Sequence, residues 1–178
     1  MTPDAALSRS IANGDTKAFA LLMRRHNRTL FRTARAILRD DAAAEDALQE
    51  AWLRAYRAMD TFRGEAKLAT WLLRIVVNEA LARLRKEQRQ VALVALAPEA
   101  EEATRRQDEP EGMAQRSDLR RRLEARIRVL PDAFRAVFLL RAVQELSVEE
   151  TAAALRIPES TVRTRFFRAR SQLREALS

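Results

Sequence analysis

Apolar residues recur every three or four positions along most of the 178-residue chain, a spacing that is typical of amphipathic helices. In the first half, the pattern predicts helices over about 2–13, 15–38, 42–58 and 68–88, with Tyr56 on the inward face of the third. Asn13-Gly14 is a typical helix C-terminus, and Asp15 is a typical N-cap. The segment 59–67, with Gly64 as its hinge, is predicted as a loop.

The second half of the chain contains a predicted helix-turn-helix. Leu119 to Leu130 mark one helix, and Pro131 begins the next, in which Val143 is among the apolar residues expected to pack inside. Ser147 and Glu150 then have capping-box spacing, and Pro158 suits the first turn of a final helix. The apolar face of this helix consists of Val162, Phe166, Ala169 and Leu173. Its other face carries Arg163, Thr164, Phe167, Arg168 and Gln172. Such a helix suits a DNA major groove, although a basic surface helix is the alternative.

The composition supports an all-α fold and argues against catalysis. Hydrophobic residues make up 47% of the chain, and it has only three glycines and five prolines. It has no cysteine, one histidine and no Gly-rich phosphate loop, so we expect no enzyme, no cofactor and no metal site. Neither a signal peptide nor a membrane span is visible, and we expect a cytoplasmic protein.

Charge divides the chain into three segments, although the total is +8. Residues 1–96 carry 17 basic and 11 acidic side chains, and residues 117–178 carry 13 and 8. Residues 97–116, with two prolines, carry three and six. Basic blocks favour a polyanionic partner. We therefore expect two small helical domains joined by a flexible acidic linker.

Several strings in this order resemble a bacterial RNA polymerase sigma factor of the small extracytoplasmic-function type. They are GDTKAFALLMRRH, EDALQEAWLRAYRAMDTFRGEAKLATWLLRIVVNEALARLRK and LPDAFRAVFLLRAVQELSVEETAAALRIPESTVRTRFFRARSQLREAL. The resemblance implies a region 2 domain at 1–96, a linker at 97–116 and a region 4 domain at 117–178. It also implies a monomer that directs core polymerase to promoters, assists their melting and is held inactive by an anti-sigma factor.

The resemblance assigns core polymerase binding to one short string. The residues are Asp46, Leu48, Gln49 and Glu50, expected to dock on the clamp coiled coil of the β′ subunit. Three of them, at i, i+3 and i+4, form a polar stripe that suits a basic helical partner. An ordinary solvated helix face is the alternative. The β flap is the second expected contact of the polymerase.

The loop 59–67 and the following helix resemble the part that recognises the minus-ten promoter element. The residues assigned to it are Asp60, Thr61, Phe62, Arg63, Lys67, Arg74, Asn78 and Arg85. Holding an unstacked base requires an aromatic or apolar pocket, polar groups and cations for the phosphates. Phe62 either faces the base or anchors the loop in the core, where we also expect Trp52 and Trp71. Ala82 departs from the polar residue common in the family, which leaves the preferred base open.

The final helix resembles the part that reads the minus-thirty-five element. The residues assigned to it are Thr161, Arg163, Thr164, Arg165, Phe167 and Arg168. For Arg165, the alternatives to reading the element are contact with a phosphate or pairing with a neighbouring acidic side chain. A repressor or activator that binds duplex DNA without polymerase is the competing interpretation. A mimic that only titrates an anti-sigma factor is disfavoured because Arg163, Arg168 and Asn78 are present.

Overall fold

The computed structural model describes residues 3–95 and 116–175, and every element within them is helical. The elements are α1 (Pro3–Ala12), α2 (Thr16–Leu38), α3 (Asp41–Arg57), η1 (Met59–Thr61), α4 (Leu68–Ala95), α5 (Arg116–Val129), α6 (Asp132–Phe138), η2 (Leu139–Val143), α7 (Val148–Leu155) and α8 (Glu159–Glu175). This confirms the all-α fold. Residues 97–115 of the predicted linker lie outside the described residues. Within the described ranges, no helix is both long and apolar enough to cross a bilayer.

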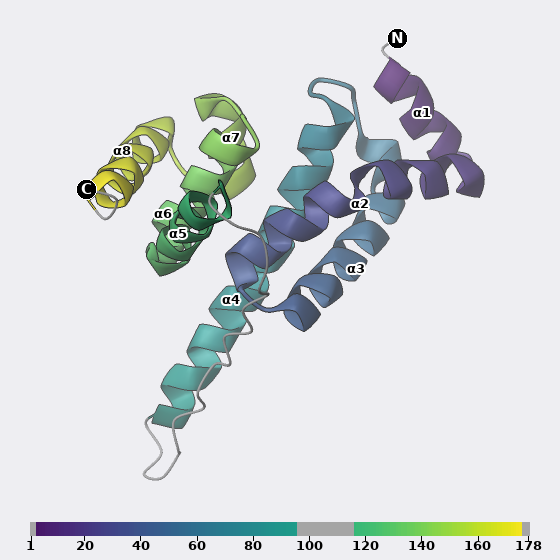
Figure 1. Cartoon of the computed structure of the whole chain (residues 1–178). Helices are drawn as coiled ribbons and strands as arrows, with labels where there is room; N and C mark the ends of the chain where they lie inside the picture. The colour runs from purple at the N-terminus through teal and green to yellow at the C-terminus, as the bar shows by residue number, and fades with distance from the viewer. Residues whose placement is uncertain (1–2, 96–115, 176–178) are drawn as a thin grey trace.

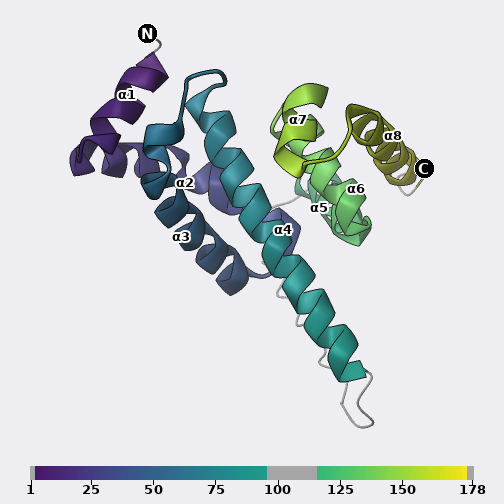
Figure 2. The ribbon, with the colours of Figure 1, turned by 180° about the vertical axis from the view of Figure 1, so that it is seen from behind.

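Helices α1 to α4 form one group, and α5 to α8 form a second (Figure 1). In the first group, α2, α3 and α4 pack against one another, and α1 lies across one end of them (Figure 2). The predicted Asp15 cap is present, because its carboxylate accepts a hydrogen bond from the first turn of α2, and the Asp40 carboxylate caps α3 in the same way. The core between these helices includes Leu22, Leu30, Trp52, Leu72 and Val76.

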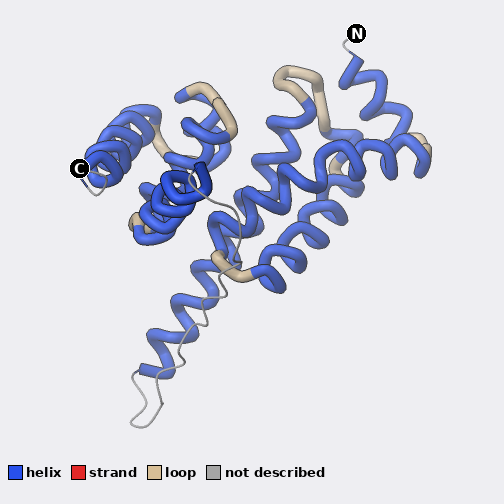
Figure 3. The backbone as a smooth tube through the Cα atoms, in the orientation of Figure 1, coloured by secondary structure: helices blue, strands red, loops and turns tan. Residues whose placement is uncertain are grey.

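In the second group, α6, α7 and α8 pack together, and α5 runs beside α8. Figure 3 shows the short loop between α7 and α8 that sets the angle of the helix-turn-helix. The Ser147 and Glu150 capping box is complete, with both of its hydrogen bonds formed. Arg156 ends α7 in the left-handed conformation, with φ of 54°. The apolar face predicted for α8 is buried at Val162, Ala169 and Leu173.

The two groups are joined through a buried arginine. The Arg135 side chain on α6 is 1% exposed, and its Nη2 donates to the Ile37 carbonyl oxygen at 2.8 Å. This carbonyl belongs to the last turn of α2, where helix carbonyls lack partners and a cation is favoured. Asp132 accepts from Arg135, and also from Arg39 and Gln88 of the first group.

Apolar residues continue this contact. Leu139, Leu140, Leu146 and Ala154 belong to the same buried cluster as the core of α1 to α4. Gln144 also donates from its Nε2 to the Thr33 hydroxyl at 3.0 Å. The second group is therefore docked on α2 and α4 by apolar burial as well as by polar contacts.

Three details differ from the sequence predictions. Helix α4 ends at Ala95 instead of near residue 88. Tyr56, expected inside, is 42% exposed because its ring packs edge-on against Phe19 at the margin of α2 and α3. Val143, also expected inside, is 51% exposed because it ends the π-helical turn η2, whose wider turn rotates it out of the helical register.

Candidate nucleic-acid interfaces

Four of the residues assigned to the minus-ten element lie on one side of α4 and immediately before its first residue. Lys67, Arg74, Asn78 and Arg85 follow one another at spacings of four and seven, so they line one side of the helix. Lys67 and Arg85 are exposed, whereas Arg74 and Asn78 are half-buried. The opposite side of α4 is buried in the core. The structure thus brings these four residues together as a solvent-facing stripe of cations around one amide.

The preceding loop supplies an aromatic pair beside this stripe. The ring of Phe62 lies 5.7 Å from that of Trp71, in an edge-on arrangement. Both rings are half-buried and pack against the core, so Phe62 does anchor the loop while keeping part of its ring accessible. Gly64 adopts φ of +75°, which favours glycine at this bend.

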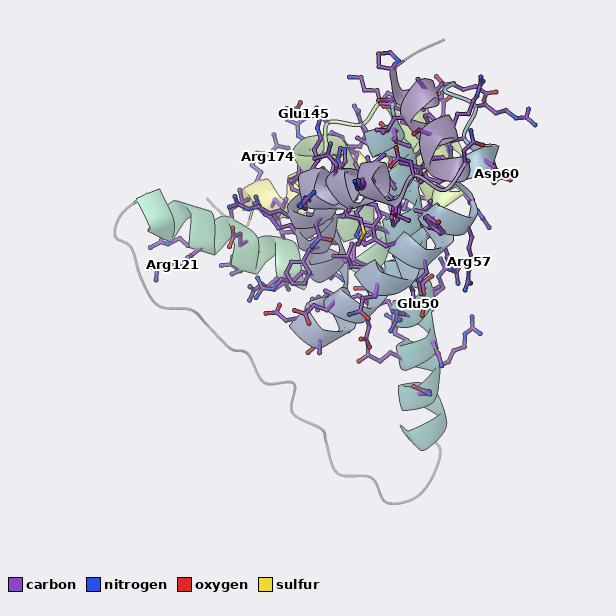
Figure 4. The ribbon with its side chains drawn as sticks, turned by 90° about the vertical axis from the view of Figure 1, so that its right-hand side faces the viewer. Glu50, Arg57, Asp60, Arg121, Glu145 and Arg174 are labelled. Atoms are coloured by element: carbon purple, nitrogen blue, oxygen red, sulfur yellow. The ribbon has the colours of Figure 1, made fainter. Side chains whose placement is uncertain are left out.

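The other loop residues face solvent. Asp60, Thr61 and Arg63 are all exposed, and Figure 4 shows Asp60 at the edge of the molecule close to α1. The Thr61 hydroxyl donates to the Ala58 carbonyl oxygen at 2.7 Å, so it closes the turn of η1. Asp60 and Arg63 are free to meet a partner from outside.

The final helix α8 presents the second set of assigned residues. Arg163, Thr164, Phe167 and Arg168 are exposed, and Phe167 is 69% exposed, which is unusual for a ring of this size. Arg163 donates to Glu159 at 2.7 Å, and the Thr164 hydroxyl donates to the Ser160 carbonyl oxygen at 3.0 Å. Thr161 and Arg165 are half-buried at the sides of this face.

Behind this face, aromatic and basic side chains pack around Phe166 and fix the helix. Phe166 of α8 stacks on Phe138 of α6, with ring centroids 6.2 Å apart. The guanidinium groups of Arg141 and Arg170 lie 5.5 and 5.8 Å from the Phe166 centroid. These contacts orient α8, so that its outer side chains are held in a defined direction.

A long apolar groove of about 1210 Å³ runs between α2 and α3. Phe19, Met23 and Phe31 line it from α2, and Leu48, Trp52 and Leu53 line it from α3. Its α2 wall also carries Arg24 and Arg28, and its α3 wall carries Glu45 and Gln49. The groove therefore has a basic edge and an acidic or polar edge around an apolar floor.

The residues assigned to polymerase binding divide between the groove and its flank. Leu48, although only 6% exposed, lines the groove together with Gln49. Asp46 and Glu50 are exposed but lie outside the lining, and Figure 4 shows Glu50 on the surface of the first group. The Asp46 carboxylate lies 3.7 Å from Arg83 of α4, whose guanidinium also approaches Glu79 at 3.6 Å.

The sequence reasoning missed part of this groove. Leu53 is 50% exposed and, with Tyr56, extends the apolar lining beyond Leu48. Leu53 adds an apolar position beside the buried stripe of Leu48, Ala51, Trp52 and Ala55. This additional apolar residue was the signal in the sequence from which the groove could have been predicted. A helix that buries one apolar stripe has no need for a further apolar residue beside it.

Two side chains of the first domain, one on α2 and one immediately before it, have lowered pKa values. Partial burial and the nearby Arg25 charge lower the pKa of His26 on α2, against an opposing effect of Asp4. Hydrogen bonds from the Ala18 backbone and the Ser10 hydroxyl lower the pKa of the Asp15 carboxyl. Both groups belong to the first domain, and His26 interacts with Asp4 of α1.

Comparison with known proteins matches both groups of helices to one family. Residues 22–90 match Sigma-70 region 2, and residues 120–173 match Sigma-70, region 4. The RNA polymerase sigma-H factor of Pseudomonas aeruginosa is 32% identical, over 98% of this chain and 93% of its own length. The ECF RNA polymerase sigma-E factor of Escherichia coli K12 is 36% identical, over 96% and 92%.

Solved structures share the arrangement over most of the chain. CnrH, in complex with the cytosolic domain of CnrY, is 26% identical with a TM-score of 0.69, and the match covers 98% of this chain and 96% of CnrH. The sigma factor RpoE of Bartonella quintana, in complex with the anti-sigma factor NepR, is 24% identical with a TM-score of 0.71. This match covers 90% of this chain and 97% of that one. The second likeness concerns the fold alone.

Proposed function

Because this chain belongs to the extracytoplasmic-function group of sigma-70 RNA polymerase sigma factors, we propose that its two exposed helical faces recognise the two elements of a promoter. It is a transcription initiation factor that directs bacterial core polymerase to specific promoters and assists their melting. The observation that carries the assignment is the stripe of exposed Lys67 and Arg85 and half-buried Arg74 and Asn78 along one side of α4, beside the loop that bears Phe62.

In this proposal the loop and α4 bind the melted minus-ten element. Phe62 and Trp71 offer the aromatic surface on which an unstacked base can rest, and the Asn78 amide can read a base edge with a donor and an acceptor. Arg63, Lys67, Arg74 and Arg85 neutralise the backbone phosphates. Binding of a melted strand at such a site requires only hydrogen bonding, stacking and charge.

Helix α8 reads the minus-thirty-five duplex in the major groove. Arg163 and Arg168 are the side chains for base edges, and Phe167 and Thr164 supply apolar contact, for which a thymine methyl is a suitable partner. Binding DNA requires Arg163 to exchange Glu159 for its new acceptor. Thr161 and Arg165, at the sides of the face, suit contacts to phosphates.

The groove between α2 and α3 is the proposed site for core polymerase. A partner helix of the β′ clamp coiled coil would bury Leu53 and meet Gln49, while Asp46 and Glu50 attract its basic side chains. The β flap would contact the second domain. An anti-sigma factor that covers the same groove would exclude polymerase, since both require its apolar floor. We propose the domain boundaries 1–96 and 117–178, and a monomer acting in the cytoplasm.

The test is reconstituted transcription. The protein is mixed with bacterial core polymerase and a library of duplex fragments randomised at both promoter elements, and run-off transcripts are sequenced. We expect selective transcripts that need both proteins, with two enriched elements. Binding of duplex DNA by the protein alone, with no association with core polymerase, would instead establish a separate DNA-binding regulator.

Polymerase binding is tested separately with a double variant. Asp46→Ala with Gln49→Ala should weaken association with core polymerase in a pull-down, because both changes remove acceptors beside the groove. The matched control is Glu149→Ala with Gln90→Ala, which removes an exposed acid and an exposed amide elsewhere. Equal retention of polymerase by the two variants would contradict the assignment of this surface.

A further inference from the structure

We propose that α1 acts as a brace that holds both ends of the minus-ten loop, with Ser8 and Asp4 as positioning residues. This inference rests on the proposed function of the loop 59–67. The helix lies before residues 22–90, which match the family, so neither residue belongs to the matched region. Figure 2 shows α1 beside η1 and beside the loop that leads into α4.

Ser8 fixes the start of the loop. Its hydroxyl donates to the Met59 carbonyl oxygen at 2.6 Å, across 51 positions of the chain. Ser8 is 2% exposed and Met59 is 1% exposed, so this hydrogen bond is shielded from water. Burying a hydroxyl without a partner is costly, and the partner here is the carbonyl of the first residue of η1.

Asp4 fixes the end of the loop. Its Oδ2 accepts a hydrogen bond from the Leu68 backbone N–H at 2.8 Å, and Leu68 is the first residue of α4. The preceding residue is Lys67, whose side chain has donors but no acceptor and cannot cap the helix. Asp4 therefore supplies the missing N-cap from 64 positions away, and its negative charge suits the positive end of the helix dipole.

The brace is itself anchored in the core. Ile11 at the end of α1 is 1% exposed, and Leu7 packs against the same cluster. Ser10 lies on the same helix, and its hydroxyl donates to Asp15 at the start of α2. Ser8 and Asp4 are spaced four residues apart, so they project from one side of α1 toward the two loop ends.

The consequence concerns the entropy of base capture. With Met59 and Leu68 held, only the residues between them remain to be ordered when DNA binds, and Phe62 is already seated on Trp71. A loop that is ordered beforehand loses less conformational freedom on binding. Releasing both ends should therefore weaken capture of the melted strand by about five- to tenfold.

The experiment uses the full chain bound to core polymerase and the promoter fragment selected by the unmodified protein. The variants are Ser8→Ala and Asp4→Ala, singly and together, with Asp4→Asn as the conservative change that keeps an acceptor for the Leu68 N–H. Ser10→Ala is the matched control on the same helix. Binding is measured to a pre-melted promoter, to the minus-thirty-five duplex and to core polymerase, together with Tm and the base preference at the minus-ten element.

We expect Ser8→Ala with Asp4→Ala to weaken binding of the pre-melted promoter and to flatten its base preference. Polymerase binding and minus-thirty-five binding should stay unchanged, Asp4→Asn should restore most of the affinity, and Ser10→Ala should behave as the unmodified protein. A merely structural role would lower Tm and all three kinds of binding together, and that result would overturn the brace.

Failure of the brace and failure of the proposed function remain distinguishable. Phe62→Ala and Asn78→Ala are measured in the same assay. If these two variants lose minus-ten binding while the double α1 variant keeps it with an unchanged base preference, the brace is wrong and the loop assignment stands. If Phe62→Ala and Asn78→Ala also bind normally, the loop assignment itself is wrong, and with it the premise of the brace.

Discussion

At the scale of single residues, the side chains proposed for DNA differ in how much they must rearrange. Arg168 is exposed and is available without breaking a described ion pair, whereas Arg163 must leave Glu159. Arg74 and Asn78 are half-buried, so their atoms are oriented by neighbours before DNA arrives. A side chain that is oriented beforehand loses less rotamer entropy on binding. The two arginines of α8 should contribute unequally, because Arg163 must first break its ion pair with Glu159.

Arg168→Ala should reduce the selectivity for the minus-thirty-five element and leave polymerase binding intact. An arginine paired with a guanine contributes about 1–3 kcal/mol of discrimination, which corresponds to roughly five- to 150-fold. Run-off transcription from promoters that differ only in that element measures the change. Arg126→Ala on α5 removes another exposed charge elsewhere and serves as the control. Unchanged promoter choice by Arg168→Ala would show that another face of α8 contacts DNA.

The single histidine should make stability depend on pH near neutrality. Burial and Arg25 lower the pKa of His26 below its usual 6.5, so the folded state binds its proton less readily than the unfolded state. The contribution is fully present above the usual pKa of 6.5 and is lost as the pH falls below that value through the lowered pKa of the folded state. The free energy of unfolding should thus be lower at about pH 5.5 than at about pH 7.5.

His26→Gln should reduce this dependence, as measured by urea denaturation at the two pH values. The pKa of Asp15 is also lowered from its usual 3.8, so its carboxylate remains ionised over this window and contributes no slope. An equally steep dependence in His26→Gln would assign the effect to another group.

At the scale of elements, helix ends were predictable where the stop or start signal is local in sequence. Asp15 and Ser147 were identified as caps because capping joins residues only three positions apart. The cap of α4 was not predictable, since its acceptor is Asp4 on another helix. The π-helical turn η2 also carried no recognised signal, and this is why Val143 was wrongly expected inside. The periodicity of apolar residues thus predicts which face of a helix is buried. It does not predict which distant residue accepts a hydrogen bond from the end of a helix.

The capping box of α7 should contribute measurably to stability. Ser147→Ala removes the acceptor of the Glu150 N–H and should destabilise the protein by about 1 kcal/mol. Because α7 supports α8, minus-thirty-five binding should weaken as Tm falls, while minus-ten binding by the holoenzyme is retained. Thermal denaturation followed by circular dichroism measures the first effect. Ser147→Asp, which restores an acceptor, should recover both properties, and its failure to do so would refute the capping explanation.

At the scale of the whole molecule, the two domains touch one another in the described arrangement. Promoter elements centred about 25 base pairs apart are separated by about 85 Å at about 3.4 Å per base pair. Domains in direct contact through Arg135, Arg39 and Gln88 do not reach across that length. Binding both elements therefore requires this contact to open. Sequence patterns did not reveal it, because its partners lie 44 to 111 positions apart.

Arg39→Ala with Gln88→Ala should loosen the contact, because it removes two of the three side-chain donors to Asp132. The chain has no cysteine, so Ala20→Cys and Ala125→Cys allow a single pair of fluorescent labels. We expect energy transfer between them to fall in the variant, with Arg24→Ala and Gln90→Ala as the control. Unchanged transfer would show that the contact does not depend on these two donors and is held by apolar burial together with the hydrogen bonds of Arg135 and Gln144.

The Asp132 contact also limits how far the two halves are interchangeable between relatives. A hybrid that joined residues 117–178 of this chain to the first domain of another sigma factor would always offer Arg135 a backbone carbonyl at position 37. The partners of Asp132 and Gln144, however, are the side chains of Arg39, Gln88 and Thr33, which belong to the first domain. Promoter-specificity chimeras assembled by exchanging the second domain should thus be matched at these three positions as well as at the recognition helix.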